Sequence, residues 1–452
     1  MAGADAARDR RTRRMLEGPI VPTILGLAAG NVPFVAGQMG AQVAEAWYIG
    51  QLGVEALASV ALVYPMLMLM QMMSAGAMGG AVNSAVARAL GAGAPDRAAN
   101  LAAHACLIAL AGAALFMLAM LGFGAAIFDL FGATERTRPA ALDYAGIVFL
   151  GAPTVWLANT LASVVRGAGA MSLASICLTA AFAIQIGLGS ALTLGLGPFP
   201  ALGLKGAALG HLIGFAAAAS TLAVAVFGGH IGLAVDLRRI SLSRAMFWDI
   251  LRVGLVAIAS PALNVATVLV VTAMVARHGA EALAGYGLGA RLELMMVPLV
   301  FGIGTALTAM VGVNAGAGQW ARARRTALTG GLIAATFAGA VGMTTAFAPA
   351  LWLGLFTDDP AAFEAGALYL GRAGPAYAFL GFGLALYFAS LGARATRWPT
   401  IAVATRLAII VGGGAMVAGQ SLESAFTVIV VAIVAFGVLN GYGLMHRTWR
   451  GS

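Results

Sequence analysis

Long apolar stretches, separated by short polar segments, dominate the chain from residue 20 onward. They are much longer than a buried β-strand of about 4–8 residues. About 20 helical residues are enough to cross a hydrocarbon layer about 30 Å thick. The pattern therefore predicts an all-α integral membrane protein with twelve spans, at residues 20–43, 56–80, 99–122, 140–163, 172–195, 204–227, 248–275, 283–310, 326–347, 363–390, 398–418 and 422–445.

An internal repeat divides these spans into two sets of six. The run from Gly53 to Ala58 matches the run from Gly279 to Ala284, at an offset of 226 in the numbering. After a slip of one residue, Gly91-Ala-Gly93 matches Gly316-Ala-Gly318. Six is an even number, so both halves have the same orientation in the membrane. Two such halves are expected to be related by a pseudo-twofold axis along the membrane normal, with a cavity between them.

The least hydrophobic interruption, Gly228 to Arg244, is the expected link between the halves. The predicted organisation is a cytoplasmic N-terminal tail at 1–19, an N-terminal six-helix bundle at 20–228, a cytoplasmic linker at 229–247, a C-terminal six-helix bundle at 248–446 and a cytoplasmic C-terminal tail at 447–452.

Composition and charge narrow the class of protein. Only 10% of the residues are charged and 61% are hydrophobic, whereas a soluble domain carries about 25% charged residues. The net charge of +9 would suit a nucleic-acid binder, but the basic residues form short clusters between apolar stretches, where they orient helices in a bilayer. Most arginines fall on one side if both termini are cytoplasmic. We expect a monomeric multi-pass protein of the bacterial inner membrane, with lipid as its surroundings and no nucleic-acid partner.

Several segments resemble the multidrug and toxic compound extrusion (MATE) family, in an order that covers nearly the whole chain. The resemblance implies two six-helix bundles that form a V-shaped cavity, and an antiporter that exports organic cations or other amphipathic toxins against inward proton or sodium flow. The segments are Glu45-Ala-Trp-Tyr-Ile-Gly-Gln-Leu-Gly53, Met72-Met-Ser-Ala-Gly-Ala-Met-Gly79, Ala89-Leu-Gly-Ala-Gly93, Gly195-Leu-Gly-Pro-Phe-Pro-Ala-Leu-Gly203, Arg291-Leu-Glu293 and Phe301-Gly-Ile-Gly-Thr-Ala306.

The sequence departs from the family pattern at positions that concern ion coupling. Glu45 stands where many relatives have Asp. Gln185 and Gly189 stand where a proton-coupled branch carries Asn and Asp, and Asn264 lies near the position of a Glu in a sodium-coupled branch. The coupling ion is therefore left open between H⁺ and Na⁺, with sodium possible at Glu45, and no other cofactor or metal is expected.

Glu293 is the first candidate coupling residue. A charge at the bilayer centre costs roughly 2.5–3.5 kcal/mol on insertion scales. Glu293 lies about ten residues into its span, hence about 15 Å deep. Arg291 precedes it by two residues and so lies about 200° round the helix. Glu293 should therefore face a cavity, or a partner on another helix in a structural ion pair or hydrogen bond.

Glu45 is the second candidate, near the outer end of the first span. Spacings of four and seven residues place it on one stripe with Gln38 and Gln42. A carboxylate partly withdrawn from water can bind and release protons near neutral pH, and its oxygens can also ligate sodium. The alternative is an interfacial carboxylate in contact with water. The family position favours a coupling role.

Neutral polar residues inside spans complete the candidate substrate cavity. Amides in spans more often bond to neighbouring helices than to a ligand. Gln38 and Asn264 are related by the repeat offset, which would place them on facing sides of the pseudo-symmetry axis. Pro33, beside the stripe, is the candidate hinge because proline removes a backbone hydrogen bond. The full set of candidate cavity residues is Gln38, Gln42, Asn264, Arg291, Asn159 and Gln185.

Rival functions lack their expected signals. A flippase for lipid-linked substrates would be expected to have a strongly cationic cavity, and only Arg291 and Arg406 are candidates. A membrane-embedded enzyme needs a clustered catalytic motif such as HExxH, and none occurs. A channel needs a ring of repeated polar groups. The prediction is a secondary active antiporter, not an enzyme, that exports amphipathic cationic drugs or toxins by alternating access.

Overall fold

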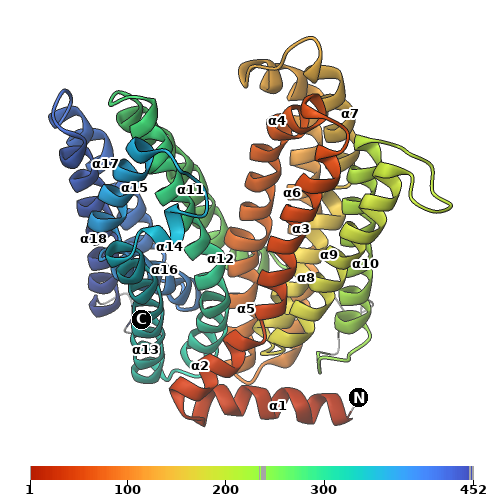
Figure 1. Ribbon diagram of the computed structural model, residues 1–452. Coiled ribbons are helices and arrows are strands. Elements are labelled where there is room, and N and C mark those ends of the chain that lie inside the picture. Colours follow the sequence, from red (N-terminus) through yellow and green to blue (C-terminus); the bar gives the residue numbers. More distant parts are fainter. Residues whose placement is uncertain (1, 234, 236–240, 447–448, 450–452) are drawn as a thin grey trace. The chain divides into compact units, whose positions relative to one another are not determined.

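The computed structural model describes residues 2–233, 235, 241–446 and 449, and every regular element in these ranges is a helix (Figure 1). The first half contains α1 (Ala2–Glu17), α2 (Ile20–Ala29), α3 (Val32–Gly50), α4 (Val54–Gln71), the π-helix η1 (Met72–Met78), α5 (Gly79–Gly91), α6 (Pro95–Leu130), α7 (Thr137–Leu150), α8 (Ala152–Gly167), α9 (Met171–Leu194) and α10 (Leu204–Phe227). The second half contains α11 (Arg244–Ala276), α12 (Ala280–Gly316), α13 (Trp320–Phe347), α14 (Ala350–Leu353), α15 (Pro360–Ala373), α16 (Tyr377–Gly392), α17 (Arg397–Met416) and α18 (Leu422–Met445).

The predicted spans correspond to these helices. Ten helical segments of the described residues are long and apolar enough to cross a membrane. Two further pairs, α7 with α8 and α15 with α16, pass the same test only together, because each single helix is too short; the pairs are bent by 45° and 59°. Counted as one span each, the bent pairs bring the number to twelve. The predicted all-α, multi-pass fold class is confirmed.

Two compact units make up the fold, and they do not follow the chain exactly. Unit 1 contains the N-terminal segment up to Arg14 together with Ala29–Gly254, and unit 2 contains Met15–Ala28 together with the chain from Leu255 onward. Each unit therefore includes a short segment whose sequence neighbours belong to the other. Within the predicted linker and C-terminal tail, residues 234, 236–240, 447–448 and 450–452 lie outside the described residues.

The internal repeat extends to helix ends and backbone conformation. Both bounds of α8 and both bounds of α16 are related by one offset, 225 in the numbering. The same offset relates Gly93 and Gly318, whose φ values are 70° and 74°, and an offset of 226 relates Gly53 and Gly279, at 104° and 108°. Positive φ is accessible to glycine at little cost. The two bent pairs are also equivalent elements, so the bend is a property of the repeat.

Small residues bring α10 unusually close to α9 in unit 1. A Cβ added to Gly206, Gly210 or Gly214 would lie 2.4 Å from backbone atoms of Leu192, Gly189 and Ala181, respectively. The three glycines are spaced by four residues and so face α9 along one stripe. Small residues allow such close approach between spanning helices. This contact fixes the position of α9, which carries Gln185.

In each unit, polar contacts hold a segment from the other half of the chain: the start of α11 in unit 1, and Met15–Ala28 in unit 2. In unit 1, Arg88 at the end of α5 and Arg97 at the start of α6 each donate to the carboxylate of Asp249 at 3.0 Å. We call this the first clasp. It holds the start of α11, and the Asp249 side chain is only 8% exposed.

The second clasp lies in unit 2 and uses different chemistry. Asn314 donates to the carbonyl oxygen of Met15 at 3.1 Å, and Arg322 donates to the carbonyl oxygen of Gly18. Arg322 is related to Arg97 by the repeat offset of 225, and Asn314 lies one residue beyond Val313, which corresponds to Arg88 at the same offset. One clasp is thus ionic, whereas the other binds backbone carbonyls.

The first clasp generates a test of its contribution to stability. Replacing Asp249 by Ala leaves two arginines without their shared carboxylate, one of them largely buried, so we expect a clear fall in the apparent melting temperature in detergent. Removing one partner of a buried pair costs about 3–5 kcal/mol. The matched control is Glu55→Ala, which breaks a pair with Arg136 whose side chains are 66% and 82% exposed and should change stability by about 0–1 kcal/mol. Equal effects of the two variants would contradict a stabilising clasp.

Candidate functional site

A partly buried carboxylate in unit 1 accepts hydrogen bonds from neutral donors on two other helices. The Tyr144 hydroxyl on α7 donates to Oε1 of Glu45 at 2.8 Å. The Gln185 Nε2 atom on α9 donates to Oε2 at 3.1 Å. Glu45 itself lies on α3, so three helices contribute one side chain each. We call Glu45, Tyr144 and Gln185 the first carboxylate cluster. Among the described residues, no cationic side chain is paired with Glu45.

A second tyrosine lies beside this cluster without a hydrogen bond. Tyr48 follows Glu45 by less than one turn of α3 and is 1% exposed. Its hydroxyl has no hydrogen-bond partner among the described residues. A Cβ at Gly189 would lie 3.0 Å from this hydroxyl, so the glycine leaves the space that the phenol occupies. The first carboxylate cluster therefore borders a buried polar group with unused hydrogen-bonding capacity.

Unit 2 contains a carboxylate with an ionic partner. The Tyr369 hydroxyl on α15 donates to Oε2 of Glu293 at 2.8 Å. The Arg406 guanidinium on α17 donates to Oε1 at 2.6 Å. Glu293 lies on α12, and we call these three residues the second carboxylate cluster. Arg291 is exposed on the same helix and pairs with no carboxylate among the described residues, so the partner of Glu293 comes from another helix.

The two clusters use equivalent helices for their hydrogen-bond donors. The numbers of Tyr144 and Tyr369 differ by 225, which is the repeat offset. Gln185 on α9 and Arg406 on α17 come from the next equivalent pair of helices. The tyrosine is thus common to both units, whereas the second donor is a neutral amide in one and a guanidinium in the other.

The carboxylates themselves are not equivalent. At the repeat offset, Glu45 corresponds to Val271 and Glu293 corresponds to Leu67. One unit places its acid on the first helix of the repeat and the other places it on the second. The units therefore share the donors' positions but obtain the acid from different helices.

Among the described residues, no hydrogen bond joins the remaining candidates to the carboxylate of Glu45 or Glu293. Gln38 is partly buried and Gln42 is exposed on α3, and Asn264 is partly buried on α11. Asn159 is buried on α8. Its Nδ2 atom donates to Oε1 of Gln71 and to the hydroxyl of Ser74, both at 2.9 Å. It thereby connects α8 to the π-helix. Asn159 therefore has a structural role, because its side chain joins neighbouring helices through hydrogen bonds.

Pro33 lies in the first turn of α3, directly after the interruption at Gly30 and Asn31 that ends α2. A proline at the start of a helix costs no intrahelical hydrogen bond. Its place at this interruption is compatible with the hinge role expected from the sequence, which stays a prediction.

Tyr144 and Tyr369 were not among the sequence candidates, and Arg406 was considered only as part of a cationic cavity. Tyrosine is common in membrane proteins, so its presence in a span attracts no attention. The signal that identifies the pair is the repeat offset between them. The offset identifies the two tyrosines as hydrogen-bond donors only after the partners of Glu45 and Glu293 have been sought in the structure.

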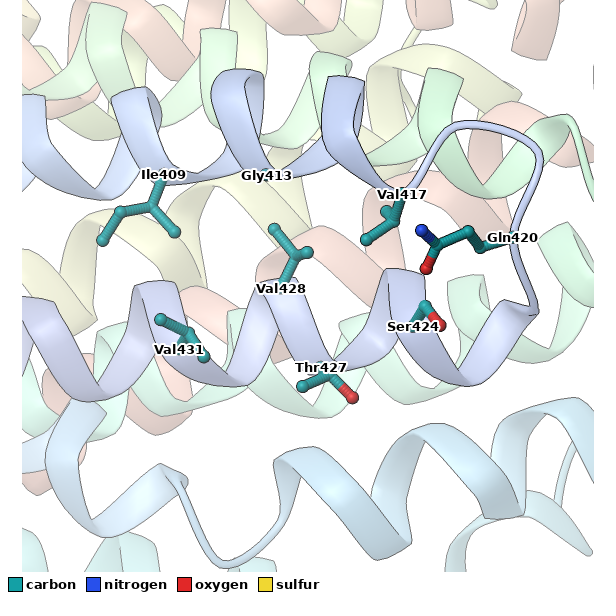
Figure 2. Close-up of a pocket in the computed structure, with 8 residues that line it drawn as sticks. All are labelled: Ile409, Gly413, Val417, Gln420, Ser424, Thr427, Val428 and Val431. Atoms are coloured by element: carbon teal, nitrogen blue, oxygen red, sulfur yellow. The ribbon is translucent and has the colours of Figure 1, made fainter.

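A pocket of about 360 Å³ lies between α17 and α18 of unit 2, away from the candidate residues (Figure 2). Figure 2 shows apolar side chains along both helices and polar ones near the loop that joins them. Its lining contains no ionisable side chain and none of the candidate site residues: it consists of Ile409, Gly413, Val417, Gln420, Ser424, Thr427, Val428 and Val431. This pocket lacks a group that could bind and release an ion by titration.

Comparison with known proteins gives consistent matches over most of the chain. A model of the MatE family matches residues 35–190 and 257–416. The FAD transporter of Shewanella oneidensis is 28% identical over 352 residues, which are 77% of this chain and 77% of that protein. The multidrug export protein MepA of Staphylococcus aureus is 27% identical over 200 residues, 44% of each chain.

Solved structures show the same fold. One described as the outward-facing conformation of a multidrug resistance MATE family transporter of the MOP superfamily matches with a TM-score of 0.85 and 22% identity, over 96% of this chain and 97% of that chain. A MOP superfamily transporter from Pyrococcus furiosus matches with a TM-score of 0.86 and 21% identity over the same shares. At these identities, the likeness concerns the fold.

The first carboxylate cluster generates a prediction with a matched control in the same site. Tyr144→Phe removes a hydrogen bond from a buried phenol to the partly buried Glu45 carboxylate, and hydrogen bonds to charged groups contribute about 1.5–3 kcal/mol. We expect a lower apparent melting temperature in detergent. Tyr48→Phe removes a hydroxyl that has no described partner from an equally buried ring, so stability should stay unchanged or rise. A larger loss for Tyr48→Phe would contradict the hydrogen-bond arrangement.

Proposed function

Because this chain belongs to the MatE family of transporters, we propose that it is a secondary active antiporter that exports small amphipathic molecules in exchange for inward-moving protons or sodium ions. It is a multi-pass membrane protein with multidrug-export relatives. The proposed location is the bacterial inner membrane, and the arginine distribution along the sequence supports an orientation with both termini in the cytoplasm. The proposed mechanism is alternating access.

The observation that carries this proposal is the environment of Glu45. Its two carboxylate oxygens accept hydrogen bonds from Tyr144 and Gln185, which are both neutral. An ionised carboxylate away from water is unfavourable unless a positive charge compensates it. A proton or a sodium ion supplies that charge, and its release leaves the carboxylate in the costly state. The occupancy of Glu45 is therefore tied to an ion that must come from solution.

The two donors suit a site that changes its occupancy. An amide can present either its nitrogen or its oxygen, and a tyrosine hydroxyl can donate or accept. Gln185 can therefore donate to an ionised carboxylate and accept from a protonated one, or turn its oxygen toward a bound cation. Export follows if the substrate and the ion stabilise opposite orientations of the transporter, because a ligand shifts a conformational equilibrium only by its differential affinity.

Amphipathic cations are the proposed substrate class, supported by the family resemblance and by the multidrug-export relative. A second candidate is FAD, because the relative with the longer match, over 77% of this chain, is named an FAD transporter. The two candidates carry opposite charges, so a direct assay separates them.

Replacing Glu45 by Gln should reduce gradient-driven export to the background of protein-free vesicles. The change keeps the shape of the side chain but removes the charge that an ion must compensate. The measurement is efflux of a cationic dye from proteoliposomes under a proton-only gradient and then under a sodium-only gradient. The gradient that drives efflux in the unmodified protein identifies the coupling ion.

Glu55→Gln is the matched control, since Glu55 is exposed and paired at the surface with Arg136. This variant should export at the normal rate. Normal efflux by Glu45→Gln under both gradients would refute the coupling role of Glu45.

FAD and a cationic dye should differ as substrates of the unmodified protein. We expect dye to move under the coupling gradient, with FAD neither moving nor competing. FAD efflux from loaded proteoliposomes that depends on Glu45, without dye movement, would instead favour the second candidate and leave the antiport mechanism intact.

A further inference from the structure

The second carboxylate cluster differs from the first in having a cation of its own. Arg406 and Glu293 form an ion pair at 2.6 Å, and their side chains are only 13% and 15% exposed. In the first cluster, the helix equivalent to that of Arg406 supplies Gln185 instead. The two units thus contain a compensated acid and an uncompensated acid in related surroundings.

Compensation changes what the acid can bind. Burying an ionised carboxylate is unfavourable unless it is paired, and a guanidinium in proteins does not lose its proton. If Glu293 took up a proton, Arg406 would remain charged and largely buried without its partner. If Glu293 took up sodium, two cations would share one carboxylate. Both changes are opposed by Arg406.

The other groups that face Glu293 are neutral. Tyr369 on α15 donates to it, and Tyr286 on α12 packs edge-to-face on the Tyr369 ring at 5.3 Å. The Tyr377 hydroxyl on α16 donates to the carbonyl oxygen of Gly289, about one turn before Glu293 on α12, at 3.4 Å. Arg406 comes from α17. Of the described residues that surround Glu293 on these four helices, Arg406 supplies the positive charge.

We propose that Arg406 is a positioning residue that acts as a resident counter-ion, so that Glu293 stays ionised and takes no part in ion coupling. Coupling then belongs to the first carboxylate cluster alone, and the number of ions moved per cycle is set by unit 1. This inference rests on the proposed antiport function. It differs from the expectation, drawn from the sequence, that Glu45 and Glu293 share the coupling.

The same ion pair also ties α17 to the rest of unit 2. This helix packs mainly against α18, with much less contact to α16. Arg406 connects it directly to α12 through Glu293. A resident counter-ion at this position keeps both ends of the link charged throughout the cycle, so the link is not broken whenever an ion enters or leaves.

The ion-to-substrate ratio is the decisive measurement, because a purely structural ion pair would not alter it. The ratio is obtained in proteoliposomes from the membrane potential and ion gradient at which net transport stops. Arg406→Gln should increase the ratio by one ion, because Glu293 becomes a second uncompensated acid. Arg406→Gln combined with Glu293→Gln should restore the original ratio, and Arg406→Lys should keep it.

An unchanged ratio in Arg406→Gln would overturn the proposal. So would a ratio in the Glu293→Gln/Arg406→Gln double variant that stays raised, because Glu293 would then not be the added site.

A second measurement requires neither transport nor a stable variant. A hydrophobic carbodiimide reacts with protonated carboxyl groups in apolar surroundings, and mass spectrometry of the unmodified protein locates the adduct. We expect modification at Glu45 and none at Glu293. Modification of Glu293 in the unmodified protein would overturn the proposal, even if vesicle assays fail. If the protein moves no substrate under any gradient, the proposed function fails, whereas the labelling result still decides the role of Arg406.

Discussion

Charges placed inside membrane-spanning helices need compensation, and this requirement organises the protein. Each unit holds a glutamate on a membrane-spanning helix, Glu45 or Glu293, and in each case donors on two other helices satisfy the carboxylate oxygens. The tyrosine hydrogen bonds to the two carboxylates are both 2.8 Å long. What differs is the source of positive charge, which is built into unit 2 at Arg406 and is missing from the described surroundings of Glu45. The same physical constraint thus yields a permanent link in one unit and a site for an exchangeable ion in the other.

Duplication explains why the two sites are alike, and divergence explains why they act differently. The equivalent tyrosines, Tyr144 and Tyr369, keep one hydrogen bond to a carboxylate in each unit. The acid has changed helix between the halves. A donor on the fourth span of a repeat can reach an acid on either of the first two spans, so the tyrosine tolerates this change. The two units therefore keep equivalent helices, but their acidic side chains lie at positions that are not equivalent.

Much of the fold could be predicted from the sequence because spanning helices are set by local apolar length. The predicted twelfth span, 422–445, has the bounds of α18. Gln185 was chosen as a candidate from its place in a span, and it does bond to Glu45. Arg406 could not be assigned to Glu293, because a pairing between helices 113 residues apart leaves no local trace. Likewise, the bond from Asn159 to the π-helix depends on a helical irregularity that residue spacing does not reveal.

The two clasps hold segments whose place along the chain differs from their place in the two compact units. Residues 15–28 are encoded in the first half but belong to unit 2, and residues up to Gly254 in α11 belong to unit 1 although the second repeat has begun. Neither half of the coding sequence therefore specifies a complete unit. A chain divided at the linker would therefore yield two fragments, each lacking a segment that its compact unit contains in the intact protein.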